Sequence, residues 1–236
     1  IFGLPFVPAG LGHVINELID RFFLKSMDPQ TVEALYGPDY TADDIVGIYS
    51  ACYKLAVFML LLVQMFRMAW QPFFMRQSEE TSAPETFSQT FSLFNFAAAA
   101  IFLSVALFAD QIVAVKVPIL DFYLVDEKFW GGLGIVPILL LAYWFQGWYV
   151  NFSAGIFISE TTKRLPQITL IGAAITIVAN LVMIPFFGMM GSAMATLLSY
   201  AVMAMLIYYY STNAFEVPYK LVSGFGVMLL AAGFYY

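Results

Sequence analysis

The sequence is poor in the residues from which most catalytic and metal sites are built. Its 236 residues include one cysteine, Cys52, and one histidine, His13, so neither an intramolecular disulfide nor a thiolate metal site can form. His13 has no second histidine as a relay partner, and an interhelical hydrogen bond is the simpler expectation for it. A glycine-rich phosphate loop ending in Lys-Ser or Lys-Thr, an HExxH motif and a GxSxG motif are all missing. We therefore expect no enzymatic activity, no metal and no organic cofactor.

Charge is also scarce, whereas apolar residues are abundant. Only 11% of the residues are charged and 61% are hydrophobic, against about 25% charged in an ordinary soluble domain. A bilayer core is crossed by about 20 apolar helical residues. We predict an all-α, polytopic transmembrane bundle of about seven helices, multi-pass in the membrane and in contact with lipid. The expected spans lie near residues 2–24, 46–69, 91–115, 133–158, 167–187 and 190–211, with a seventh starting near Tyr219.

The spans divide the chain into two parts. Residues 1–211 are expected to form a six-helix transmembrane lobe, and residues 212–236 a linker and the start of an additional, truncated helix. The chain opens with Ile1 and lacks a basic segment followed by a cleavage site, so it carries no recognisable signal peptide. We expect it to be a fragment of a longer protein.

Alternating spans fix which loops share a side of the membrane. Loops 70–90, 159–166 and 212–218 share one side, and the pair Lys163-Arg164 in a short loop indicates that this side is cytoplasmic. Within the first loop, Gln71–Gln89 mixes rings with charges, which fits either a helix along the inner surface or a solvated loop. The net charge of −6 gives no reason to expect a nucleic-acid partner.

One face of the first span is polar. At spacings of three, four, seven and eight it carries His13, Asn16, Glu17, Asp20 and Arg21. Charges inside a membrane are costly and usually mark a site. Lys54, at a similar depth in the second span, could pair with Glu17 or Asp20. The pair could serve substrate binding or ion coupling, or it could only fix the helix register.

Other polar groups are less distinctive. Gln64 and Arg67 approach the cytoplasmic end of the second span, where Arg67 could bind a substrate or reach the headgroups. Pro5 and Pro8 could form a hinge or a static kink in the first span.

The late spans indicate a scaffold. Apart from Gln167 at its first position, Thr169, Thr176 and Asn180 are the only polar residues of 167–187, and Gly191, Ala195 and Ser199 recur every fourth residue beside Ser192 and Thr196. Such a small-residue face lets two helices approach closely.

Four stretches together resemble a known family of transporters. They are Ile184–Thr196, which is similar to a P-x-x-G-x-x-G-[AS]-A-x-A-T signature, Gly3–Pro8 leading to Asp20-Arg21, Gly47–Ala51 with Tyr53-Lys54, and Phe66–Phe73. In their order along the chain they resemble polysaccharide flippases of the multidrug/oligosaccharidyl-lipid/polysaccharide exporter superfamily.

The resemblance implies a two-lobe transporter with alternating access, of which this chain would be the second lobe plus one helix. The function implied is flipping of undecaprenyl-pyrophosphate-linked oligosaccharide across the bacterial inner membrane for surface polysaccharide such as O-antigen. The partners implied are this substrate and a missing N-terminal lobe. Lys54 and Arg67, with Arg21 a weaker candidate, would hold phosphate, Asn16 and Gln64 would bind sugar hydroxyls, and Glu17 and Asp20 would couple a proton or sodium ion. The alternatives are a cation-coupled multidrug exporter of the same superfamily and a membrane scaffold subunit without transport.

Overall fold

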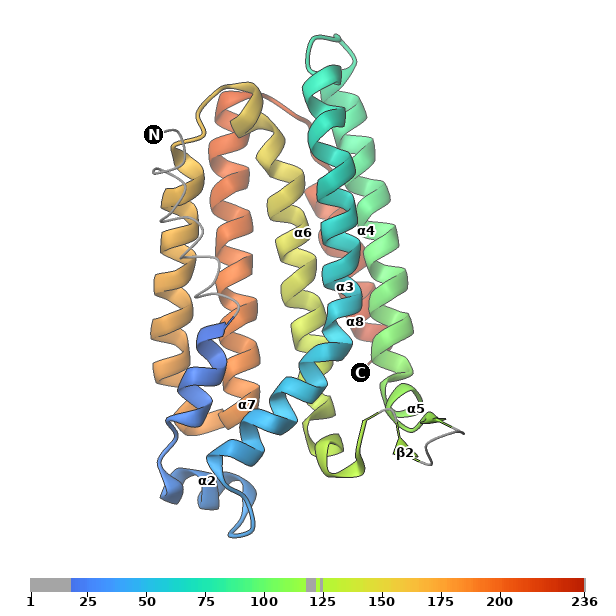
Figure 1. Ribbon diagram of the computed structural model, residues 1–236. Helices are drawn as coiled ribbons and strands as arrows, with labels where there is room; N and C mark the ends of the chain where they lie inside the picture. The colour runs from blue at the N-terminus through green and yellow to red at the C-terminus, as the bar shows by residue number, and fades with distance from the viewer. Residues whose placement is uncertain (1–17, 118–121, 124, 236) are drawn as a thin grey trace.

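The computed structural model describes residues 18–117, 122–123 and 125–235, which form a bundle of helices (Figure 1). A helical segment covers residues 18–25. It is followed by α2 (Pro29–Tyr36), α3 (Ala42–Gln77), α4 (Ala83–Leu107), α5 (Ala109–Val113), the 3-10 helix η2 (Glu127–Ile135), α6 (Val136–Ile158), α7 (Arg164–Ala214) and α8 (Leu221–Tyr235). The strands β1 (Lys116–Val117) and β2 (Phe122–Tyr123) pair antiparallel over two residues each. Apart from this short ladder, the predicted all-helical architecture is confirmed.

Four helical stretches are long and apolar enough to cross a membrane. They are α3, α4, the continuous stretch Glu127–Ile158 formed by η2 and α6, and α7. Helix α8 is shorter, with 15 residues. At about 1.5 Å of rise per residue it is about 22 Å long. Of the predicted first span, only residues 18–24 belong to the described part of the chain. The described residues therefore support a membrane protein with at least these four apolar helices.

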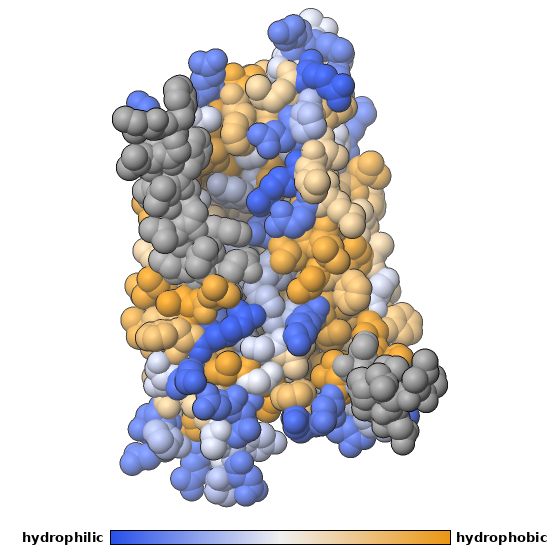
Figure 2. All heavy atoms as spheres, viewed as in Figure 1, coloured by the Kyte–Doolittle hydropathy of each residue, from blue (hydrophilic) through white to orange (hydrophobic). Residues whose placement is uncertain are grey.

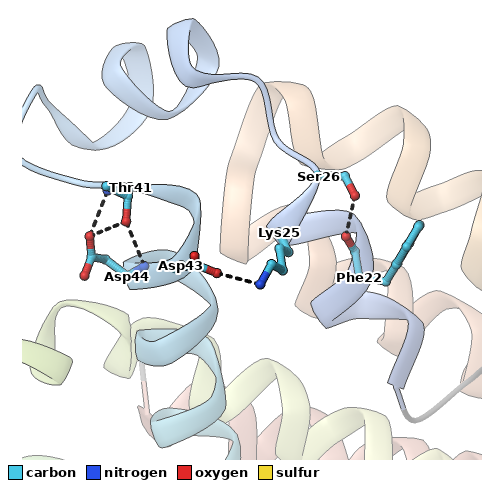
Figure 3. A network of polar contacts seen from close by, with 6 residues as sticks. All are labelled: Phe22, Lys25, Ser26, Thr41, Asp43 and Asp44. Atoms are coloured by element: carbon cyan, nitrogen blue, oxygen red, sulfur yellow. Dashed lines mark hydrogen bonds and ion pairs between the residues drawn. The ribbon is translucent and has the colours of Figure 1, made fainter.

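The second predicted span is longer at both ends than its hydropathy indicates. At the start of α3, Thr41 and Asp44 form a reciprocal cap, in which the Thr41 hydroxyl accepts the Asp44 N–H (3.3 Å) and the Asp44 carboxylate accepts the Thr41 N–H (2.9 Å) (Figure 3). At its other end the buried rings of Trp70 and Phe74 keep the helix packed as far as Gln77. Residues 71–77 thus continue α3, and α4 begins at Ala83. The loop predicted for Gln71–Gln89 is confined to residues 78–82, and no separate surface helix forms there.

Helix α7 folds back on itself at Gly188. This residue has φ 54° and ψ −128°, a left-handed backbone conformation that glycine adopts without steric cost. The two halves of α7 then run antiparallel (Figure 1), and the Ser199 hydroxyl of the second half donates to the Gly172 carbonyl of the first (2.9 Å). At Gly191 a Cβ would lie 2.4 Å from the Met183 carbonyl oxygen. The structure thus confirms both the division into 167–187 and 190–211 and the close approach predicted for the small-residue face.

The outer helix α2 braces this turn. The Tyr36 hydroxyl accepts a hydrogen bond from the Met189 N–H (2.7 Å), directly after the residue at which α7 reverses. Burial raises the pKa of the Tyr36 hydroxyl above its ordinary value, so the side chain is neutral at physiological pH. Two segments 153 residues apart in sequence are held together at this point.

The centre of the bundle is α6, which is buried along most of its length between α3, α4 and α7. The Asn95 side-chain oxygen of α4 accepts hydrogen bonds from the indole N–H groups of Trp144 and Trp148 (2.8 Å each). Large apolar side chains are exposed on the outside of the bundle, as on α7 (Val178), α4 (Leu93) and α8 (Val222). The α3–α4, α6–α7 and α7–α8 connections all lie at one end of the bundle (Figure 1), which confirms that the predicted loops share a side.

We expect Gly188→Ala to destabilise the fold. A Cβ at this position would lie 1.9 Å from the Tyr36 hydroxyl oxygen, and the backbone conformation is unfavourable for alanine. The cost should be about 1–3 kcal/mol, measured as a lower thermal unfolding midpoint in detergent. Gly233→Ala is the matched control, because no atom lies within 4 Å of its Cβ position. An unchanged midpoint for Gly188→Ala would show that this turn does not constrain α7.

Candidate functional site

The buried carboxylate of Asp20 is the centre of a polar cluster between three helices. Asp20 is 0% exposed. Its Oδ2 atom accepts hydrogen bonds from the hydroxyls of Tyr49 on α3 and Thr196 on the second half of α7, both at 2.8 Å. Its Oδ1 atom accepts from the Asn180 side-chain amide on the first half of α7 (3.0 Å). The side-chain oxygen of Asn180 in turn accepts from the Ser192 hydroxyl (2.9 Å).

The turn at Gly188 creates this cluster. Asn180 lies before the turn and Thr196 after it, so the antiparallel return of α7 brings both side chains to the same carboxylate. The two bonds span 160 and 176 residues of sequence. An ionised carboxylate in an apolar bundle is costly unless donors compensate it. Three converging donors supply that compensation, and they hold the 18–25 segment against α3 and α7.

Arg21 lies beside the cluster and faces two tyrosine rings. Its guanidinium carbon is 4.5 Å from the ring centroid of Tyr53 and 5.9 Å from that of Tyr49. Both distances are within the range of a cation–π interaction. The positive charge of Arg21 therefore lies close to the Asp20 carboxylate and against the aromatic surface of α3.

The predicted pairing of Asp20 with Lys54 is wrong within the described residues. The side chain of Lys54 is exposed, whereas Asp20 is enclosed by the neutral donors described above. Tyr49 and Lys54 are five residues apart on α3, and at 3.6 residues per turn they point about 140° away from each other. The ion pair that the structure does contain in the described region joins Lys25 and Asp43 at 3.1 Å, on the surface (Figure 3).

Several predicted site residues cannot be placed. Pro5, Pro8, His13, Asn16 and Glu17 lie outside the described residues, so the hinge and the remainder of the polar stripe stay predictions.

A second polar site lies nearer the α3–α4 end of the bundle. A cavity of about 260 Å³ between α3, α6 and α7 is lined by Arg67 and by the aromatic side chains of Trp70 and Phe157. The face on which α7, α6 and α3 lie side by side carries polar residues between apolar flanks (Figure 2). Further polar residues lining the cavity are Gln71, Gln146, Tyr149, Ser153, Thr169 and Tyr200. Gln64 is half-buried on α3 and does not line it.

Gln146 gives this cavity an unsatisfied acceptor. The side chain is 4% exposed, and its Oε1 atom has no hydrogen-bond partner. Buried polar atoms are nearly always paired in folded proteins, so a ligand or water with a donor group is expected there. Arg67 supplies charged donors in the same cavity, close to the Tyr149 hydroxyl. A molecule with an anionic group for Arg67 and a hydroxyl for Gln146 fits this chemistry, and the surrounding rings offer surfaces on which it can pack.

The structure changes the role of the late spans. Asn180 and Thr196, predicted as parts of a scaffold, bind the buried carboxylate, and Gln146 was not singled out at all. An amide within an apolar span is itself a signal, because its polar atoms must find partners inside the membrane. Among the described residues no cluster of three or more His, Cys, Asp or Glu side chains could hold a metal ion. The oxygen atoms around Asp20 could accept a proton or an alkali cation.

Comparison with known proteins gives no relative for this chain: no protein-family model, no curated protein sequence and no solved structure matches it.

We predict that Asn180→Leu destabilises the protein and that neutralising Asp20 recovers part of the loss. The leucine removes a donor from Asp20 and an acceptor from Ser192, and an unsatisfied buried group costs about 1–3 kcal/mol, more if it is charged. In the double variant Asp20→Asn/Asn180→Leu, no buried carboxylate charge remains at this position. Thermal unfolding in detergent measures both effects.

Val178→Leu on the exposed, apolar side of the same helix is the control and should shift the unfolding midpoint little. Strictly additive losses in the double variant would contradict a direct electrostatic interaction between Asp20 and Asn180.

Proposed function

We propose that the chain is the second lobe of a secondary transporter that flips undecaprenyl-pyrophosphate-linked oligosaccharide across the bacterial inner membrane, for the synthesis of surface polysaccharide such as O-antigen. The observation that carries the proposal is the fully buried Asp20 carboxylate, shared by the 18–25 segment, α3 and both halves of α7. Ionisable groups inside apolar bundles are expensive and mark ion or substrate paths. A first lobe would supply the opposite wall of the substrate path.

In this proposal Asp20 is the coupling site. Its ionised form is stabilised by hydroxyl and amide donors from helices that must move relative to one another during alternating access. Binding of a proton or a sodium ion removes the negative charge and weakens the attraction to those donors. The charge state of Asp20 therefore biases the packing of α7 against α3, and an ion gradient can drive the conformational change through that bias.

The Arg67 cavity would receive the pyrophosphate. A guanidinium can form two parallel, charge-assisted hydrogen bonds to phosphate oxygens, and Gln146 can accept a bond from a sugar hydroxyl. Lys54 lies 13 residues before Arg67 on α3, which corresponds to about 20 Å along the helix. One pyrophosphate cannot touch both residues at once, so we assign them to successive positions of the substrate as it crosses.

Orientation follows from the basic residues at one end of the bundle. Arg76, Lys163, Arg164 and Lys220 lie in or beside the three connections that share this end. Basic loops favour the cytoplasmic side. In this proposed orientation the Arg67 cavity would be open to a substrate made in the cytoplasm.

The charge of the cavity argues against export of organic cations. Among the described residues its lining includes one cation, Arg67, and no carboxylate. The positive charge of Arg67 would repel an organic cation, although aromatic rings also line the cavity. A membrane scaffold without transport would tolerate neutralisation of Asp20 and Arg67 with no effect beyond changed assembly.

We expect Arg67→Ala in the full-length protein to abolish complementation of a flippase-deficient strain, because the first phosphate contact is lost. Surface polysaccharide should fall about tenfold or more, as expected for the loss of a charge-assisted bond, while lipid-linked precursor accumulates in the inner leaflet. Lys54→Ala should reduce flux without preventing binding. Arg76→Ala is the matched control, because this exposed arginine lies outside the cavity.

Normal polysaccharide from Arg67→Ala, at unchanged protein level, would refute the assignment of phosphate binding to this cavity. Resistance to cationic dyes in place of polysaccharide rescue would favour a drug exporter.

A further inference from the structure

Four buried tyrosines connect Asp20 with the Arg67 cavity. The chain begins with Tyr49, whose hydroxyl donates to Asp20 and whose ring centroid is 5.7 Å from that of Tyr53. The hydroxyls of Tyr53 and Tyr143 are hydrogen bonded to each other. The ring of Tyr143 lies 6.1 Å from that of Tyr200, and Tyr200 lines the cavity.

These tyrosines have little freedom to move independently. Their exposed fractions are 0% for Tyr49, 6% for Tyr53, 0% for Tyr143 and 2% for Tyr200. They come from α3, α6 and the second half of α7, so the contacts cross two helix interfaces. Protein interiors are packed as densely as organic crystals. A change in the position of one ring therefore has to be accommodated by its neighbours.

A change at Asp20 acts directly on the first tyrosine. While the carboxylate is ionised, Oδ2 accepts from both Tyr49 and Thr196. A proton or a cation on Oδ2 competes with these two donors for the same lone pairs. Tyr49 must then weaken its bond or rotate, and its ring contacts Tyr53.

The second half of α7 provides a parallel connection. Thr196 and Tyr200 are four residues apart and so lie on one face of the helix. Thr196 contacts Asp20 and Tyr200 lines the cavity. Any displacement of this helix by the carboxylate also displaces the cavity wall.

We propose that Tyr53 and Tyr143 are positioning residues that link the charge state of Asp20 to the shape of the Arg67 cavity. The link rests on the proposed function, in which Asp20 is the coupling site and the cavity receives the substrate. Neither tyrosine touches the carboxylate, and neither lines the cavity. Their hydroxyl–hydroxyl bond is the step that joins α3 to α6 along this path.

The test measures the cavity without any substrate. In full-length protein carrying Cys52→Ser, a cysteine is introduced by Ser153→Cys, because Ser153 lines the cavity. The rate at which a quaternary-ammonium methanethiosulfonate modifies it is compared with and without Asp20→Asn, in lipid nanodiscs. We expect Asp20→Asn to change the rate about fivefold or more, the lower range of allosteric coupling.

Adding Tyr143→Phe, or separately Tyr53→Phe, should reduce this dependence on Asp20 to less than about twofold. Either variant removes the same bond and keeps the ring, so one that elutes as a folded protein is sufficient. Tyr219→Phe is the matched control: it removes a buried hydroxyl that bonds the Asn151 carbonyl (3.4 Å) and lies off the path. With this control the full dependence should remain.

Two results would overturn the proposal: no change in rate on Asp20→Asn, or an undiminished change in either phenylalanine variant that elutes as a folded protein. Failure of the proposed function has a different signature, because a protein that flips no lipid-linked oligosaccharide can still show the predicted labelling pattern.

Discussion

The constraint on which the rest of the structure depends is the burial of one carboxylate among apolar helices. An ionised group away from water has to be compensated by hydrogen bonds or opposite charge. For Asp20 the donors come from Tyr49, Asn180 and Thr196, and these three residues can converge only if α7 reverses at Gly188. The positive-φ glycine at the turn, the bracing contact from Tyr36 and the small residues that let the two halves of α7 touch all serve that convergence. The turn of α7 at Gly188 and the hydrogen bonding of the Asp20 carboxylate therefore depend on each other.

The second site is separated from the first but shares its helices. Tyr49, which bonds Asp20, and Arg67, which lines the cavity, lie at different heights along α3. The second half of α7 carries both Thr196 and Tyr200. The Arg67 cavity combines a cation with an unpaired amide oxygen, whereas Asp20 is saturated with donors. One site is therefore suited to bind a polar anion, and the other to change charge. The proposed function assigns the substrate to the Arg67 cavity and the coupling ion to Asp20.

Hydropathy predicted the four long apolar helical stretches, because apolar stretches of span length have few alternatives. It did not predict α2, and it misplaced the ends of α3 and α4 by several residues. Helical periodicity also placed Asp20 on the polar face of the first span, and Asp20 is the centre of a buried polar cluster. The predicted partner was wrong because a search for opposite charge selects Lys54, whereas the actual donors are neutral. Tyr49 lies on α3 itself, and the other two, Asn180 and Thr196, lie on α7, 160 and 176 residues away in sequence. In the sequence Asn180 and Thr196 resemble residues that only pack between helices. The turn at Gly188 brings both side chains to Asp20, and the local sequence does not show which distant residues such a turn brings together. Gln146 lies among apolar residues in the sequence. What distinguishes it is its side-chain oxygen, which is buried in the folded bundle without a hydrogen-bond partner.

Flux under an imposed ion gradient tests the central claim, that Asp20 couples ion binding to movement of the substrate. Full-length protein in proteoliposomes with fluorescent lipid-linked oligosaccharide would be compared with its Asp20→Asn variant, with and without a proton or a sodium gradient. The account predicts that one of the two gradients accelerates flipping by the unmodified protein and that the variant no longer responds to it. A variant that responds to the gradient as the unmodified protein does would contradict the assignment of Asp20 as the coupling site.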